Sequence, residues 1–165
     1  DVHREIRNIA FNLMPQTLMN EGLVAAVEEL IKRINSTNQL QVKLSVLDVS
    51  QRLGEVVEVS LYRIIQEFLS NIMKYSQASQ VYLGLTQHED ELVLTIEDDG
   101  IGYDLSKFMN SQGNGWRNIN TRLNLIKGEM EVDTQEGRKG SSILITIGKE
   151  MIIIKKDQVT ANNVA

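Results

Sequence analysis

The sequence contains no cysteine and only one proline among its 165 residues. The lack of cysteine excludes thiol catalysis, zinc sites built from thiolates, and disulfides. No apolar run approaches the roughly 18 residues that a membrane span needs. The chain also begins at Asp1, without an initiator methionine or an apolar leader. We therefore expect a cytoplasmic piece of a longer protein that makes no membrane contact of its own.

Basic residues are outnumbered by acidic ones. Lys and Arg total 17, Asp and Glu total 22, and the formal net charge is −5. An acidic average argues against a general nucleic-acid-binding surface, so no nucleic-acid partner is expected. The 42% hydrophobic and 24% charged composition excludes disordered and collagen-like chains. Eight of the 11 glycines lie from Gly100 onward, which predicts a glycine-rich loop region.

Hydrophobic periodicity predicts one α+β domain. Helical spacing of apolar residues and strand-like alternation divide the chain. The helical segments are 2–14, 23–35, 55–75 and 117–127, and the strands are 40–46, 81–86, 92–97, 130–134 and 142–147. The connection between 81–86 and 92–97 is too short for a crossover, so these strands form an antiparallel hairpin.

The connections between these segments follow from turn-forming residues. Pro15 predicts the end of the first helix near Met14, and Asn20 to Gly22 predict a turn. Residues 98–117 show no period and are expected to form a polar loop. Residues 155–165 are polar and are expected to fray.

The helix at 55–75 carries a polar row opposite its apolar face. At 100° per residue, Arg63, Glu67, Asn71 and Lys74 fall within an arc of about 80°. A solvated face with i,i+4 ion pairs explains this spacing. Asn is a poor helix former and usually needs a partner in a helix, which favours a binding row. Both interpretations stay open on spacing alone.

The strand at 92–97 runs into Asp98-Asp99-Gly100-Ile101-Gly102. Glycines lack Cβ and let the backbone approach a ligand closely, while Asp98 can accept a hydrogen bond from an exocyclic amine. An EF-hand loop is excluded because its first ligand position would be Thr95. A dinucleotide-binding fingerprint is excluded because its third glycine position holds Leu105. A simple acidic turn remains the alternative.

Two further glycine segments precede regular elements. Gly113-Asn114-Gly115 comes just before the helix at 117–127, where free N–H groups and the helix dipole suit phosphates. Gly140-Ser141-Ser142 precedes the last strand and is a weaker signal of the same kind.

The order of these motifs resembles the nucleotide-binding domain of sensor histidine kinases, in the gyrase, Hsp90, histidine kinase and MutL ATPase superfamily. Glu67 to Tyr75 looks like the N box, Asp98 to Gly102 like the first glycine box, and Gly113 to Gly115 like the second. The resemblance covers about residues 4–148. The segment from Glu5 to Ala26 is similar to the second dimerisation helix and its link in the nitrate-sensor-like subfamily.

The resemblance implies a two-layer sandwich of a mixed, mainly antiparallel sheet against helices, the Bergerat-type fold, with an N-terminal helical extension. It divides the chain into residues 1–20 of the dimerisation hairpin, an ATP-binding domain at 21–150 and a tail at 151–165. The acceptor helix of the hairpin is absent. His3 is a poor phosphoacceptor candidate because Arg4 follows it in place of the acidic residue usual in the family, and His88 is a poor one because it lies in a predicted hairpin turn.

The resemblance also assigns roles to residues. Glu67 is the catalytic residue, a base or orienting group for the incoming imidazole, and Asn71 is the Mg²⁺ ligand. Asp98 would bind the adenine amine with Gly100 and Gly102 around the base, and Arg117 would lie near the triphosphate. The expected ATP-binding residues are Asn71, Lys74, Tyr75, Asp98, Gly100, Gly102, Gly113, Asn114, Gly115 and Ser141, with Ser141 expected to hold phosphate.

The implied activity is transfer of the γ-phosphoryl of Mg-ATP to a histidine on a dimerisation helix, for relay to a response regulator. The full-length protein is expected to be a homodimer that a membrane segment can anchor. Two alternatives remain. One is another ATPase or serine kinase of the superfamily, such as an anti-sigma kinase. The other is a non-catalytic binding or dimerisation module.

Overall fold

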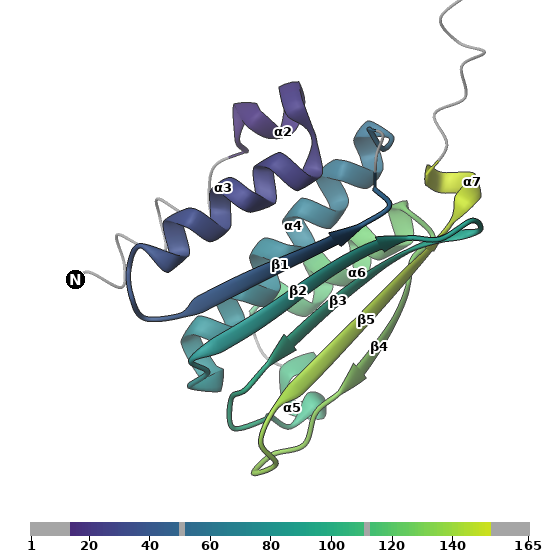
Figure 1. Cartoon of the computed structure of the whole chain (residues 1–165). Helices are drawn as coiled ribbons and strands as arrows, with labels where there is room; N and C mark the ends of the chain where they lie inside the picture. The colour runs from purple at the N-terminus through teal and green to yellow at the C-terminus, as the bar shows by residue number, and fades with distance from the viewer. Residues whose placement is uncertain (1–13, 50–51, 111–112, 153–165) are drawn as a thin grey trace, which may run out of the picture.

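The computed structural model describes residues 14–49, 52–110 and 113–152, in which helices cover one face of a five-stranded sheet (Figure 1). The expected helix at 2–14, with His3, lies outside the described residues. The helices are α2 (Gln16–Glu21), α3 (Leu23–Asn35), α4 (Glu55–Asn71), the π-helix η1 (Ile72–Ser76), α5 (Leu105–Met109), α6 (Gly115–Leu125) and α7 (Lys149–Ile152). The strands are β1 (Gln41–Leu47), β2 (Gln80–Gln87), β3 (Glu91–Asp98), β4 (Glu129–Asp133) and β5 (Ser141–Gly148).

The sheet has the strand order β1-β2-β3-β5-β4. β1 and β2 are parallel because α4 returns the chain to the same end of the sheet between them, and the other pairs are antiparallel. β2 and β3 form the predicted hairpin. This arrangement confirms the α+β class with a mixed, mainly antiparallel sheet against one helical layer.

The hydrophobic core lies between the sheet and the helical layer. Alternate residues of β3 and β5 point toward the helices and are buried, as strand periodicity requires. They meet the apolar face of α4, where Leu61, Ile64 and Phe68 are almost completely covered. This packing fixes how α4 is rotated, and it turns the opposite polar side of the helix, with Glu67, toward Gly115 at the start of α6.

The turn expected at Asn20 to Gly22 is wrong in extent, because α2 starts directly after Pro15 and includes Asn20 and Glu21. Pro15 is the N-cap of α2, with φ −73°, a value suited to a helix start. Only Gly22 breaks the helical path. It adopts φ +100° between α2 and α3, a conformation that favours glycine.

The loop predicted at 98–117 contains a short helix that periodicity missed. Asp104 caps α5, since its Oδ1 accepts from the amides of Ser106 at 2.9 Å and Lys107 at 3.4 Å. A five-residue helix is too short to show a hydrophobic period. The helix predicted at 117–127 also begins earlier, at Gly115. The last turn of the helix predicted at 55–75 is the π-helix η1.

Core residues lie on both sides of the expected limits at 21 and 150. Leu18 in α2 and Ile152 in α7 are buried in the same hydrophobic cluster as the centre of the sheet. The division at 1–20, 21–150 and 151–165 remains a prediction. Within the described part of the chain, no helix combines the length and apolar character needed to cross a membrane.

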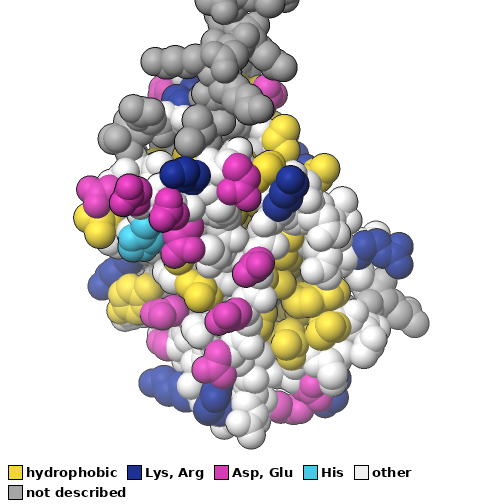
Figure 2. All heavy atoms as spheres, turned by 90° about the vertical axis from the view of Figure 1, so that its right-hand side faces the viewer, with side chains coloured by type: hydrophobic (Ala, Val, Ile, Leu, Met, Phe, Trp, Pro, Cys, Tyr) yellow, Lys and Arg dark blue, Asp and Glu magenta, His cyan; other side chains and the backbone are white. Residues whose placement is uncertain are grey.

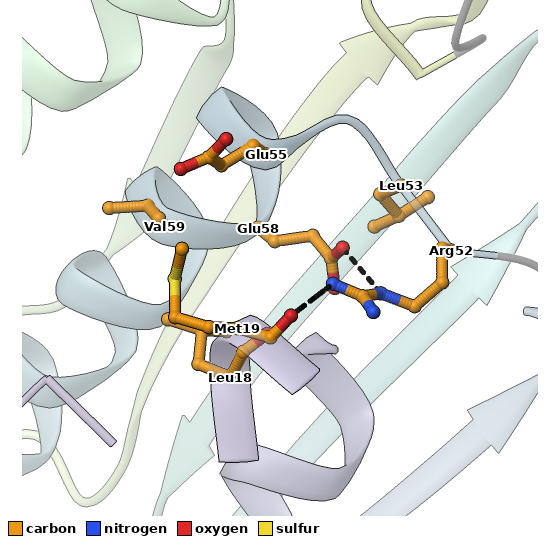
Figure 3. Close-up of a pocket in the computed structure, with 7 residues that line it drawn as sticks. All are labelled: Leu18, Met19, Arg52, Leu53, Glu55, Glu58 and Val59. Atoms are coloured by element: carbon orange, nitrogen blue, oxygen red, sulfur yellow. Dashed lines mark hydrogen bonds and ion pairs between the residues drawn. The ribbon is translucent and has the colours of Figure 1, made fainter. Parts of the chain in front are cut away.

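An ion pair between the half-exposed Arg52 and the buried Glu58 joins α2 to the start of α4 (Figure 3). Glu58 is 3% exposed, and its two oxygens accept from Arg52 Nε at 2.8 Å and from the Leu23 amide at 2.5 Å. The remaining guanidinium nitrogens donate to the last carbonyls of α2, those of Leu18, Met19 and Asn20. Arg52 and Glu58 also line a cleft of about 310 Å³. The pair therefore ties the N-terminal helix to the helix that carries the polar row.

Replacing Glu58 with Ala should destabilise the fold by about 2 kcal/mol, because the Leu23 amide loses a buried acceptor and the half-exposed Arg52 loses its partner. Glu58→Gln keeps an acceptor for Leu23 and should cost about half as much. Urea denaturation measures both values. Glu55→Ala, an exposed carboxylate in the first turn of the same helix, is the control. A Glu58→Ala loss no larger than the control's would contradict this role.

Candidate functional site

The polar row of α4 meets the start of α6. Glu67 and Asn71 lie on the side of α4 that faces Gly115, the first residue of α6. A methyl group added at Gly115 would collide with Oε1 of Glu67 and would lie 3.7 Å from Nδ2 of Asn71. The first and third sequence motifs, more than 40 residues apart, are therefore in contact. Arg63 instead bonds to Gln66, its Nη1 donating to Oε1 at 3.0 Å.

The Asn71 amide is an unsatisfied polar group inside this contact. Its Nδ2 atom is buried and has no hydrogen-bond partner. A buried amide without a partner is costly and is common where a ligand completes the site. Amide oxygen and nitrogen exchange places by a rotation of the side chain, so the same position can present an oxygen. Among the described residues, no group of three His, Cys, Asp or Glu side chains could hold a metal by itself.

The π-helix η1 carries the rest of the N-box-like segment. Lys74 is exposed, and the Tyr75 ring is 66% exposed. Ser76 closes the element inside the protein, with its Oγ donating to the Ile72 carbonyl at 2.8 Å. Single-turn π-helices are rare and often occur at functional sites. The widened turn leaves a cation and an aromatic ring at the surface next to Asn71.

Asp98 lies at the end of β3 and is 8% exposed. Its Oδ1 accepts from the Gly100 amide at 2.8 Å. Burial raises the pKa of this carboxyl, with a smaller increase from the charge of Asp99, while the Gly100 hydrogen bond acts in the opposite direction. A solvated acidic turn would not bury its first carboxylate, so the burial favours the binding interpretation.

Both glycines after Asp98 are required by the packing. A methyl group at Gly100 would collide with the carbonyl oxygen of Ser76. Gly102 has φ +71°, and a methyl group there would collide with the carbonyls of Gln135 and Arg138. The backbone of this turn is therefore held between η1 on one side and the β4–β5 connection on the other.

Ser141 lies next to Asp98, its register partner across β3 and β5. It is 6% exposed, and its Oγ is 2.8 Å from Oγ1 of Thr134. Thr134 also accepts from the Tyr103 amide at 3.0 Å. Ser141 thus sits at the Asp98 end of the site and not beside the α6 glycines. Sequence reasoning missed Thr134, because a single threonine after a strand gives no signal.

An aromatic row connects the Asp98 turn to α6, and it was not predicted. The Tyr103 and Phe108 ring centroids are 5.7 Å apart, and those of Phe108 and Trp116 are 5.5 Å apart, both edge to face. Burial raises the pKa of Tyr103 to about 12. The sequence did contain a signal for this row, because three aromatic residues occur within the 14 residues of the glycine-rich segment 103–116.

The remaining predicted residues lie on the surface. Gly113, Asn114 and Arg117 are exposed, and a methyl group at Gly113 would meet no described atom within 4 Å. Asn114 is the N-cap of α6 but makes no side-chain capping bond. His88 is exposed in the β2–β3 hairpin, among acidic side chains (Figure 2).

Comparison with known proteins agrees with this geometry. Residues 56–151 match the family described as histidine kinase-, DNA gyrase B-, and HSP90-like ATPase. The chain belongs to this ATPase family. The match begins in α4 and ends in α7, so it contains the polar row, the Asp98 turn and the α6 glycines.

Curated relatives of this chain include sensor histidine kinases. The chain is 34% identical over 139 residues to the sensor histidine kinase ComP of Bacillus subtilis, covering 84% of this chain and 18% of ComP. It is 28% identical over 134 residues to the oxygen sensor histidine kinase NreB of Staphylococcus carnosus, covering 81% and 39%. The chain thus spans well under half of the length of these relatives.

Solved structures show the same fold. A histidine kinase domain from the Erythrobacter litoralis EL346 blue-light activated kinase matches with a TM-score of 0.63 at 22% identity, covering 76% of this chain and 64% of that one. Acinetobacter baumannii AdeS matches with a TM-score of 0.61 at 16% identity, covering 89% and 75%. These findings confirm the predicted resemblance to the ATPase domain of sensor histidine kinases, and the NreB match agrees with the nitrate-sensor-like subfamily.

Substituting Gly115 with Ala should weaken ATP binding about tenfold, because the new methyl group displaces the Glu67 side chain from the start of α6. Calorimetric titration with ATP measures the change. Gly54→Ala is the matched control, since Gly54 has a φ of −59° and a methyl group there would lie 3.9 Å from the Met151 carbonyl oxygen. Equal effects of the two variants would show that contact with α4 does not matter for binding.

Proposed function

We propose that this chain is the ATP-binding catalytic domain of a two-component sensor histidine kinase. It binds Mg-ATP and transfers the γ-phosphoryl to a histidine on a dimerisation helix of the full-length protein, which passes it to a response regulator. The contact of Glu67 and Asn71 with Gly115 carries the proposal, because it brings a carboxylate and an amide to a helix N-terminus. The full-length kinase acts as a homodimer with this domain in the cytoplasm.

The Asp98 end of the site recognises the base. The Asp98 carboxylate accepts from the exocyclic amine of adenine, and its burial makes that hydrogen bond selective, since a base without the amine leaves a buried acceptor unpaired. Gly100 and Gly102 allow the turn to approach the ring. Ser141 lies beside Asp98, and we assign it to the base-binding end of the site. The family resemblance had implied that Ser141 holds a phosphate group. Tyr75 packs beside the base from the surface of η1.

The α6 end of the site holds the triphosphate. The first N–H groups of α6 have no intrahelical partner and form a positive end suited to phosphate oxygens. Gly113, Asn114 and Gly115 pass over the phosphates, with Arg117 beside them. Lys74 adds a mobile cation from η1. These groups neutralise and position the phosphates, which is the main catalytic requirement in phosphoryl transfer.

The Asn71 amide fits a magnesium ion. Its buried group has no protein partner and can present an oxygen, the ligand type that Mg²⁺ prefers. Magnesium usually takes few protein ligands and completes its shell with water and phosphate oxygens, which agrees with the lack of a carboxylate cluster in the described chain. The bound ion would supply charge neutralisation of the β- and γ-phosphates.

We assign Glu67 the role of orienting the attacking imidazole or accepting its proton. An imidazole nitrogen attacks the γ-phosphorus, the bond from that phosphorus to the β,γ-bridging oxygen breaks, and ADP leaves with the bond electrons. Glu67 orients the imidazole or accepts its proton, because its carboxylate lies at the start of α6 beside Asn71. The acceptor histidine comes from the dimerisation helix, since His88 is at the opposite end of β3 from Asp98.

Mixing the chain with Mg-ATP labelled at the γ-phosphate and a separately made phosphoacceptor hairpin tests the reaction. Label on histidine is expected, with transfer by Glu67→Gln at least about a hundredfold slower and ATP affinity retained. Glu97→Gln, an exposed glutamate at the end of β3, should transfer like the parent. Label on serine would indicate an anti-sigma type kinase, and release of phosphate alone a self-hydrolysing ATPase. Nucleotide binding without any reaction would indicate a non-catalytic module.

Asn71→Ala should reduce ATP affinity about tenfold in the presence of magnesium and remove the response to added magnesium. The parent's affinity should rise with magnesium under the same conditions. Titration of both proteins over a series of magnesium concentrations measures this. An unchanged magnesium response in the variant would refute the ligand role of Asn71.

A further inference from the structure

Asp99 stands next to Asp98 but turns toward β2 and away from the site. Its Oδ1 accepts from the backbone amides of Ser79 at 2.8 Å and Gln80 at 2.9 Å. Its Oδ2 accepts from Oγ of Ser79 at 2.7 Å. The Asp99 amide donates to the Gln80 carbonyl at 3.2 Å. These hydrogen bonds lower the pKa of Asp99, so it stays ionised through the neutral range.

The segment that Asp99 holds follows directly from the N-box-like helix. η1 ends at Ser76, Gln77 reverses the chain with φ +54°, and Ser79 and Gln80 enter β2. The Ser79 carbonyl accepts from the Gln41 amide at 3.0 Å, which anchors this entry to β1. Asp99 therefore connects the Asp98 turn to the entry of β2, which the hydrogen bond to β1 holds in place.

The same turn is tied at two other points. The Ile101 amide donates to the Ser76 carbonyl at 2.8 Å, and the Gly140 amide donates to the Gly100 carbonyl at 2.7 Å. Both ties use backbone groups that any sequence can supply. Asp99 provides the side chain that reaches from the turn to the entry of β2. Its loss would remove the side-chain ties between the turn and the entry of β2, and would leave the backbone ties, including the bond from the Asp99 amide to the Gln80 carbonyl.

We propose that Asp99 is a positioning residue that sets the direction of the Asp98 carboxylate, and thereby the selectivity of the site for an adenine amine. The proposal rests on the function proposed above. Asp99 touches no nucleotide in this role. Its carboxylate acts through three hydrogen bonds that hold the backbone next to Asp98 in place. Asp99 also raises the pKa of Asp98 by its charge, so loss of that charge alone would favour the ionised Asp98 and would not weaken binding.

The experiment compares ATP with purine riboside triphosphate, which has the same triphosphate but lacks the 6-amine. The parent should prefer ATP, and Asp98→Asn should remove that preference. Asp99→Ala should lose about tenfold in ATP affinity and change affinity for the amine-free nucleotide by less than about twofold. A general loss of structure would weaken both nucleotides together, so the ratio of the two dissociation constants identifies positioning.

Two conservative variants protect the test against misfolding. Asp99→Asn keeps an oxygen for the Ser79 and Gln80 amides and should stay within about threefold of the parent's ATP affinity. Ser79→Ala removes the hydroxyl that donates to Oδ2 and should lose about twofold to threefold, again for ATP only. Asp90→Ala changes an exposed aspartate at the opposite end of the hairpin and should match the parent.

The outcomes separate the two proposals. A parent chain that binds neither nucleotide overturns the proposed function and this inference with it. A parent that binds both equally overturns the recognition of the amine by Asp98, and with it this inference, but leaves nucleotide binding in place. A selective parent whose Asp99→Ala variant keeps the same ratio overturns this inference alone. Equal weakening of both nucleotides in Asp99→Ala and Ser79→Ala also overturns it, since the residue would then be merely structural.

Discussion

The burial of one face of α4 against the sheet is the constraint on which the rest of the structure depends. Leu61, Ile64 and Phe68 fit the inward residues of β3 and β5 and leave the helix no freedom to rotate. The polar residues on the other side of the helix are thereby aimed without needing contacts of their own. A row of hydrophobic side chains thus decides where a carboxylate and an amide can act.

The site is built from three elements that end at one edge of the core, and each is fixed by a different force. Hydrophobic packing fixes α4, and the strand ladder fixes Asp98 opposite Ser141. The glycines of the Asp98 turn lie close to neighbouring carbonyls, and Gly115 of α6 lies close to the Glu67 side chain. Such a division agrees with a pocket whose ligand contributes the remaining interactions. Among the described residues, the amide nitrogens of Asn71 and Gln66 are buried without a hydrogen-bond partner, and of the two only Asn71 lies beside Gly115.

The sequence was sufficient for the elements with strong periods and for the motifs, but not for the short connecting structures. The helices around Leu30 and Leu61 and the strands of the β2–β3 hairpin follow from hydrophobic spacing alone. α5 and α7 contain five and four residues, too few for a period, and their positions depend on Asp104 capping and on burial of Ile152. Pro15 is the N-cap of α2, a start that its fixed φ suits and that the sequence interpretation did not include. The predicted helix before it lies outside the described residues. The position of Ser141 beside Asp98 depended on strand register, which the sequence does not reveal.

The chain contains a single tryptophan, Trp116, at the second position of α6 and in contact with the Phe108 ring. All of the indole fluorescence of this protein therefore originates beside Gly115, at the junction of the phosphate end of the site and the aromatic row. The emission of that one side chain is a built-in optical probe of the start of α6. Movements of this region can be followed in the unlabelled protein, in real time and without altering a residue.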